Sequence, residues 1–120
     1  MTQQCTESVN DKTNTLPAEK SVLIQPDDGI EMGRFRLREG VTEAAMRAAW
    51  AHMTSTYLSA QPGWRGQRLI RCEDGTFMDM AFAASPACAH SICDSWAGQA
   101  ACDAFLQLID PVSMEFGSVI

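Results

Sequence analysis

The segment from Gly66 to Ala84 reads GQRLIRCEDGTFMDMAFAA and holds two runs of strand-forming residues on either side of Asp74-Gly75. An Asp-Gly pair between two such runs predicts a β-hairpin, because both residues tolerate the positive φ of a type I′ turn. A two-residue loop would place Ile70 opposite Asp79. The hairpin is therefore the centre of the predicted sheet.

Side chains alternate along each strand, so this register gives the hairpin two different faces. One face is apolar and suited to lie beneath helices, with Leu69, Met78, Met80 and Phe82. The other face is mixed, with Arg68, Ile70, Cys72, Phe77, Asp79 and Ala81. We expect a functional site to lie on the mixed face.

The composition predicts one domain and excludes several kinds of partner. The chain has 120 residues, of which 46% are hydrophobic, which is enough for a single core. A net charge of -6 argues against nucleic acid and against an anionic membrane surface as partners. No apolar run approaches the roughly 20 residues of a membrane span, and the N-terminus lacks the pattern of a secretory signal. An odd count of five cysteines favours reduced thiols and a cytoplasmic location.

The rest of the chain supplies two further strands and two helical regions. Residues 1–28 are predicted to be a flexible polar tail, with 21–25 as a candidate short edge strand, and residues 29–120 to form the domain. A strand is expected over 30–38, and a helix runs from its cap at Thr42 to about Ala60. A second helical region begins at Ser85-Pro86 and breaks at Gly98, and the last strand covers 112–116.

This order predicts an α+β fold, a ferredoxin-like βαββαβ antiparallel sheet with the helices on one face. The third strand should lie between the first two, and the first between the third and fourth. The uncovered face would then carry Met32, Arg34, Arg36, Arg68, Ile70, Phe77 and Asp79. That is too much apolar area to leave in water, so we expect a homodimer through the open sheet face, closing a dimeric α+β barrel around a cavity.

Three stretches resemble a known family: EMGRFRLREGVTEAAM, then QPGWRGQRLIRCEDGTFMDMAFAASPACA, then IDPVSM. They are similar to the antibiotic biosynthesis monooxygenase (ABM) family of dimeric α+β barrels over about residues 29–118. The resemblance implies the fold and a homodimer. It implies an activity only loosely, because that superfamily includes oxygenases, isomerases, decarboxylases and proteins with no assigned reaction.

The heme-degrading branch of that superfamily uses an Asn on the first strand together with a Trp and a His from the second helical region. Here asparagine occurs only at Asn10 and Asn14, and His90 precedes Trp96, the reverse of that branch's order. Heme degradation is therefore not expected, and no cofactor is predicted. The remaining enzymatic branch is cofactor-free oxidation of quinols or polyketide aromatics, which needs an apolar cavity with one or two polar groups.

The candidate catalytic residues are Asp79, as a general base, and Arg68. The candidate ligand-binding residues of the barrel cavity are Met32, Arg34, Arg36, Ile70, Cys72 and Phe77. Guanidinium groups there could hold a carboxylate or a phenolate. The structural alternative is an Arg68–Asp79 ion pair, with the other arginines paired to Glu31 or Glu115.

Two hypotheses of function follow from the sequence. The first is an ABM-like protein that binds a small aromatic or anionic molecule in its cavity and acts as a cofactor-independent monooxygenase. The alternative is a non-catalytic dimeric module that is structural or only binds a ligand. A metal site is not expected, because His90 and Cys93 share a helical face but Cys88 projects elsewhere and no fourth ligand is evident.

Overall fold

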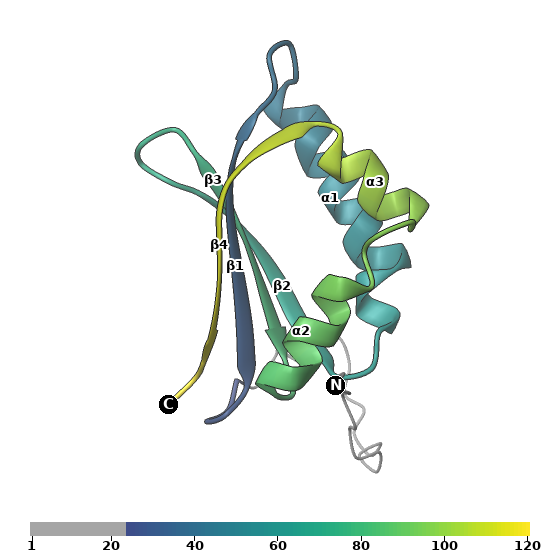
Figure 1. The fold of residues 1–120 in the computed structure, drawn as a ribbon. Helices are drawn as coiled ribbons and strands as arrows, with labels where there is room; N and C mark the ends of the chain where they lie inside the picture. Colours follow the sequence, from purple (N-terminus) through teal and green to yellow (C-terminus); the bar gives the residue numbers. More distant parts are fainter. Residues whose placement is uncertain (1–23) are drawn as a thin grey trace.

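The computed structural model describes residues 24–120, which form a four-stranded antiparallel sheet with helices on one face (Figure 1). The strands lie in the order β2-β3-β1-β4, as predicted. The elements in chain order are β1 Gly29–Leu37, α1 Glu43–Thr56, the 3₁₀ turn η2 Leu58–Ala60, β2 Trp64–Arg71, β3 Phe77–Ala83, α2 Pro86–Asp94, α3 Ala100–Leu106 and β4 Ile109–Ser118. The fold is thus α+β and ferredoxin-like. Residues 1–23 of the predicted tail, including most of the candidate strand at 21–25, lie outside the described residues.

The helices begin where local sequence signals indicate, but α1 ends at Thr56, earlier than the predicted end near Ala60, and the 3₁₀ turn η2 follows it. Thr42 caps α1 by accepting a hydrogen bond from the Ala45 N–H at 3.1 Å. Ser85 caps α2 in the same way, and Pro86 occupies the first helical position. Gly98, at φ 85°, separates α2 from α3, because a left-handed backbone interrupts a helix.

Strand β4 is longer than the sequence pattern predicted, since it already begins at Ile109. Proline within a strand is tolerated at a sheet edge, where its missing N–H breaks no ladder bond. Pro111 lies on such an edge strand, and the register of β1 against β4 shifts between Arg34 and Phe35, which faces Pro111. Asp110-Pro111 therefore lies within the strand, and the preceding helix ends at Leu106.

The hairpin loop has three residues and not two, which corrects the predicted register. Cys72 and Thr76 close the loop, with the Cys72 N–H donating to the Thr76 carbonyl at 2.9 Å. Only Gly75 has positive φ in this loop, at 93°, whereas a type I′ turn requires two such residues. The Asp74 carboxylate accepts hydrogen bonds from the Thr76 N–H and hydroxyl, which stabilises the longer loop.

The added loop residue exchanges the two faces of β3. Leu69, and not Ile70, lies opposite Asp79. Phe77, Asp79, Ala81 and Ala83 are all buried and point to the helix layer. The prediction that Phe77 and Asp79 lie on the open face was therefore wrong, because the parity of the register decides the face of every side chain in a strand.

The open face is nonetheless apolar, because the side chains that β3 turns outward are also hydrophobic. Three cross-strand pairs occupy it, Ile30 with Phe82, Met32 with Met80, and Ile70 with Met78. None of the six is buried in the single chain. Arg34 and Arg68 belong to the same face by alternation, so the sequence predicted its β1 and β2 members correctly.

The cysteines are only partly as expected. Cys72, Cys93 and Cys102 are free thiols. Cys88 is disulfide-bonded, so the expectation of reduced thiols was wrong for this residue. Within residues 24–120, no helix is both long and apolar enough to cross a membrane. The cytoplasmic location stays a prediction.

Candidate functional site

A buried carboxylate, Asp79, lies at the centre of a hydrogen-bonded cluster between the sheet and α1. The Trp50 indole N–H donates to its Oδ1 at 2.8 Å. The Gln67 side-chain amide donates to Oδ1 at 3.0 Å and to Oδ2 at 3.1 Å. Gln67 is oriented in turn by the Trp64 indole, which donates to its Oε1 at 2.9 Å. Asp79 is only 5% exposed, and these donors replace part of its lost hydration.

A second buried carboxyl group, Glu31, lies on β1 near Asp79 and is 4% exposed. Burial and the negative charge of Asp79 raise the pKa of Glu31 from 4.5 to about 7, against a hydrogen bond with Cys93 that lowers it. Burial also raises the pKa of Asp79, while the hydrogen bonds from Trp50 and Gln67 oppose that change. The two carboxyl groups therefore differ in their environment. Asp79 has hydrogen-bond donors that favour its ionised form, whereas the pKa of Glu31 lies near neutral pH, as a group that exchanges protons requires.

Both carboxyl groups line a cavity of about 250 Å³ between the sheet and the α2–α3 region. Its walls are mostly apolar and consist of Glu31, Gly33, Arg34, Phe35, Asp79, Trp96, Phe105, Leu106, Ile109, Pro111, Val112, Ser113 and Met114. Gly33 lies between Asp79 on β3 and Met114 on β4 in the sheet. A Cβ atom at Gly33 would meet only the Met114 methyl group, at 3.9 Å, so the glycine leaves room in the cavity beside the carboxylates.

Trp96, which also lines the cavity, carries a hydrogen-bond donor without a partner among the described residues. The indole nitrogen of Trp96 is buried, and no described residue accepts its hydrogen bond. An unpaired buried N–H is costly, and in native structures it commonly marks a place for a ligand or a water molecule. Trp96 and the two carboxyl groups thus give one cavity a free donor beside two acceptors, a set that matches a hydroxyl or carbonyl group on an apolar molecule.

The predicted site residues are divided between different parts of the molecule. Asp79 and Arg34 both border the cavity, but the Arg34 side chain belongs to the open face by alternation and donates to the Thr76 hydroxyl at 2.8 Å. Phe77 lies in the helix-facing core, next to a separate groove along α1. The remaining candidates lie outside the cavity: Met32, Arg36, Arg68, Ile70 and Cys72.

The predicted Arg68–Asp79 ion pair was wrong. The two side chains lie on opposite faces of the sheet, and the Arg68 guanidinium donates to the Gln67 carbonyl at 2.8 Å. Glu31 and Trp96 are site residues that the sequence analysis missed. One signal could have found Glu31, because alternation places it on the same strand face as the apolar residues Phe35 and Leu37, and a carboxylate on such a face needs an explanation.

The residues weighed as metal ligands do not form a site. Within residues 24–120, no group of three or more His, Cys, Asp and Glu side chains is arranged to hold a metal ion. The His90 ring stacks on Phe116 with a centroid distance of 3.8 Å. Burial, together with the nearby Glu31 and Asp94 charges, raises the pKa of the Cys93 thiol to about 12, so Cys93 remains protonated at neutral pH.

The fold can be compared with that of known proteins. A scan against protein-family models and a search of curated proteins found no match. Among solved structures, SnoaB, a cofactor-independent oxygenase from Streptomyces nogalater, is 16% identical with a TM-score of 0.64, covering 78% of this chain and 94% of its own. The chain shares the fold of this oxygenase.

Two structures that are named as antibiotic biosynthesis monooxygenases (ABM) show the same likeness. A putative antibiotic biosynthesis monooxygenase from Bordetella bronchiseptica is 14% identical with a TM-score of 0.66, covering 80% of this chain and 99% of its own. Another, from Caulobacter crescentus, is 14% identical with a TM-score of 0.62, and the match covers 79% of this chain and 92% of that protein. At these identities the likeness establishes the ABM fold, and function has to be argued from the site.

Proposed function

We propose that this ABM-fold protein binds a small hydroxylated aromatic molecule in the cavity and deprotonates it as the first step of a cofactor-independent oxygenation. The observation that carries the proposal is the pair of buried carboxyl groups, Glu31 and Asp79, facing an apolar cavity that also holds the free Trp96 N–H. A volume of about 250 Å³ suits one or two fused rings. The oxygenase named among the structural neighbours supports the reaction class.

In this proposal Glu31 is the general base. Its pKa of about 7 allows it to accept a proton near neutral pH and to release it again, whereas an ordinary glutamate would be a weak base. Burial raises the pKa of Asp79, and the hydrogen bonds from Trp50 and Gln67 oppose that change by favouring its ionised form. The negative charge of Asp79 in turn raises the pKa of Glu31. The Trp96 N–H would donate to the oxygen of the substrate and stabilise the arenolate.

The arenolate is electron-rich and would react with O2, the only co-reactant needed. For a substrate such as 1-naphthol, one oxygen atom becomes a carbonyl at the ring carbon para to the hydroxyl. The other oxygen atom leaves as water with the hydroxyl hydrogen and the hydrogen of that carbon. The arene loses four electrons and O2 gains four, so the products are 1,4-naphthoquinone and water.

The test measures ligand binding and oxygen uptake in separate assays. We expect the protein to bind 1-naphthol more tightly than 1-methoxynaphthalene, because the ether has no proton for Glu31. Gly33→Leu should abolish binding of both probes by filling the cavity, and Trp96→Phe should weaken binding of 1-naphthol by about tenfold. Oxygen uptake with 1-naphthol should be lost in Glu31→Gln while binding remains.

Equal affinity for 1-naphthol and its ether, unaffected by Gly33→Leu, would refute the site. Binding of 1-naphthol without any oxygen uptake would instead support a binding protein without oxygenase activity. Glu39→Gln, at an exposed turn outside the cavity, is the matched control and should leave binding and oxygen uptake unchanged.

We also propose that the open sheet face pairs with a second copy of the chain. The apolar pairs on that face, such as Met32 with Met80, are too extensive to remain in water. Light scattering after size exclusion should report a dimer, and Met80→Glu should convert it to a monomer. Ile24→Glu, at an exposed apolar residue outside the sheet, should leave the dimer intact. A monomeric wild-type protein would refute this proposal.

A further inference from the structure

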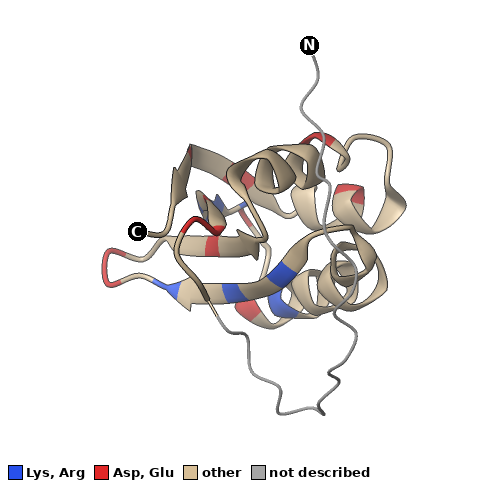
Figure 2. Ribbon diagram, turned by 90° about the horizontal axis from the view of Figure 1, so that it is seen from below, with Lys and Arg blue, Asp and Glu red and all other residues tan. Residues whose placement is uncertain are grey.

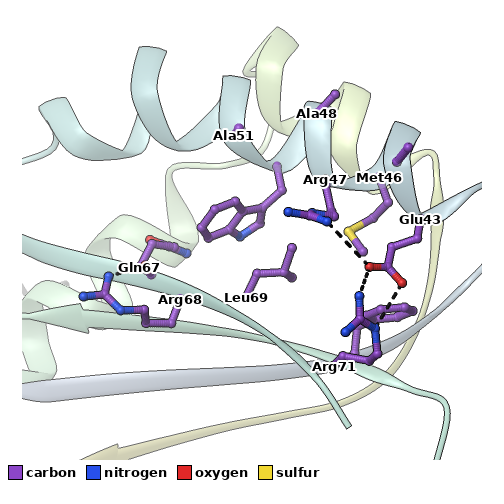
Figure 3. Close-up of a pocket in the computed structure, with 12 residues that line it drawn as sticks. Glu43, Met46, Arg47, Ala48, Ala51, Gln67, Arg68, Leu69 and Arg71 are labelled. Carbon is purple, nitrogen blue, oxygen red and sulfur yellow. Dashed lines mark hydrogen bonds and ion pairs between the residues drawn. The ribbon is translucent and has the colours of Figure 1, made fainter.

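A second and larger hollow lies on the outer side of α1, separate from the carboxylate cavity. This groove has a volume of about 860 Å³ and runs between α1 and the edge strand β2. Figure 3 shows its residues, with Glu43, Arg47 and Ala51 above on the helix and Arg68, Leu69 and Arg71 below on the strand. The proposed oxygenation takes place outside the groove, although Trp50 and Gln67, the donors to Asp79, also line it.

The groove carries positive charge in an acidic protein. Three arginines, Arg47, Arg68 and Arg71, line it together with a single carboxylate, Glu43. Its formal charge is therefore about +2, although the whole chain carries -6. In Figure 2, several blue segments lie close together along one strand and the helix beside it, while red segments are spread around the molecule.

The three arginines differ in how far they are already paired. Arg71 is held firmly, because its Nε donates to Glu43 Oε1 at 3.2 Å and a second nitrogen contacts Oε2. This pairing lowers the pKa of the Glu43 carboxyl group. Arg47 reaches the same carboxylate only at 4.0 Å, with a side chain 66% exposed. For Arg68, the described part of the chain offers a backbone carbonyl and no carboxylate.

Beneath these charges the groove is apolar. Met46, Trp50 and Leu69 line it, and Met46 is part of the hydrophobic core. Apolar walls with a flat indole favour an aromatic ring system, and guanidinium groups at the rim favour a carboxylate. The combination matches one class of ligand, a planar aromatic acid.

We propose that the groove between α1 and β2 is a binding site for an aromatic carboxylate, whose rings lie against Trp50 and Leu69 and whose carboxylate is held by Arg47. Arg68 borders the groove on β2, but its side chain belongs to the open face of the sheet, and Arg71 stays with Glu43. The carboxylate cavity would reject such an ion, because Glu31 and Asp79 both line it. The two hollows therefore differ in charge, and the proposal stands independently of the oxygenation.

The probes are 2-naphthoate and its neutral analogue 2-naphthamide, titrated by calorimetry at neutral pH and moderate salt. The wild-type protein should bind 2-naphthoate at least tenfold more tightly than 2-naphthamide. Arg47→Gln should weaken binding of 2-naphthoate by about tenfold and leave 2-naphthamide unchanged, and Arg47→Lys should restore part of the loss. Because the Arg47 side chain is mostly exposed, these variants should fold, which circular dichroism can verify.

Two controls make the result decisive. Arg38→Gln removes an arginine that pairs with Asp110 outside the groove, and it should not change binding of 2-naphthoate. Gly33→Leu, which fills the other cavity, should also leave it unchanged, so failure of the oxygenation proposal does not affect this test. No binding of 2-naphthoate, equal binding of the amide, or loss of binding in Gly33→Leu would each overturn the proposal.

Discussion

Replacing Glu31 with glutamine should stabilise the protein, and more so as the pH rises. The pKa of Glu31 is about 7 in the folded protein, whereas a solvent-exposed glutamate, as in the unfolded chain, has a pKa of 4.5. The unfolded chain therefore releases this proton at a lower pH than the folded protein does. Between these two values the folded state binds more protons than the unfolded state, and the stability contributed by Glu31 falls as pH rises. Glutamine has the size of neutral glutamic acid but cannot ionise, so the variant does not lose this stability as the pH rises.

The magnitude follows from the shift in pKa. At about 1.4 kcal/mol per pH unit, the difference between 4.5 and about 7 corresponds to about 3 kcal/mol once both states are ionised. By the same linkage, the free energy of unfolding of Glu31→Gln should exceed that of the wild-type protein by about 1 kcal/mol near pH 5 and by about 3 kcal/mol near pH 8. Differences in packing between the two side chains cancel in this comparison of pH values.

The assay is urea denaturation of both proteins at the two pH values, followed by circular dichroism. Glu39→Gln is the control, because Glu39 is exposed and its replacement should show no pH-dependent advantage. If the advantage of Glu31→Gln is the same at both pH values, Glu31 has an ordinary pKa and cannot serve as a base near neutral pH. The proposed acid–base role would then be refuted.

Two further substitutions test the hydrogen-bonded cluster and the loop. Trp50→Phe removes the indole donor from Asp79 and should cost about 2 kcal/mol in the free energy of unfolding, measured by urea denaturation near pH 8; a change below about 0.5 kcal/mol would contradict the bond. Gly75→Ala forces a side chain into a backbone at φ 93° and should cost about 1–2 kcal/mol by the same assay, whereas Thr54→Ala on α1 should cost less.

The fold was predictable because its signals are local and repeated. Thr42 and Ser85 cap the helices, Gly98 breaks the second helical region, and apolar residues such as Met46 and Met53 recur at helical spacing. Each signal acts within a few residues, and together with the handedness of crossovers they determine the strand order.

The site was only partly predictable, because it depends on whether the hairpin loop has an odd or an even number of residues. Asp74-Gly75 fits a two-residue or a three-residue loop, and the choice rests on the hydrogen bonds that Asp74 makes with Thr76. Both faces of β3 are apolar apart from Asp79, so hydrophobicity did not reveal the error. Partners such as Trp50 and Trp96 come from distant segments, and their contacts with the sheet appear only in the folded chain.

The three-residue loop has a consequence for how the chain tolerates insertions and deletions. Surface hairpins commonly accept changes of length, since solvent surrounds the affected backbone. Here, deleting Glu73 would shorten the connection by one residue, and restoring the ladder would turn Asp79 toward the outside and bring a methionine beneath the helices. A loop remote from the cavity thus constrains the chemistry of the interior, and its length should be harder to alter than the identity of its residues.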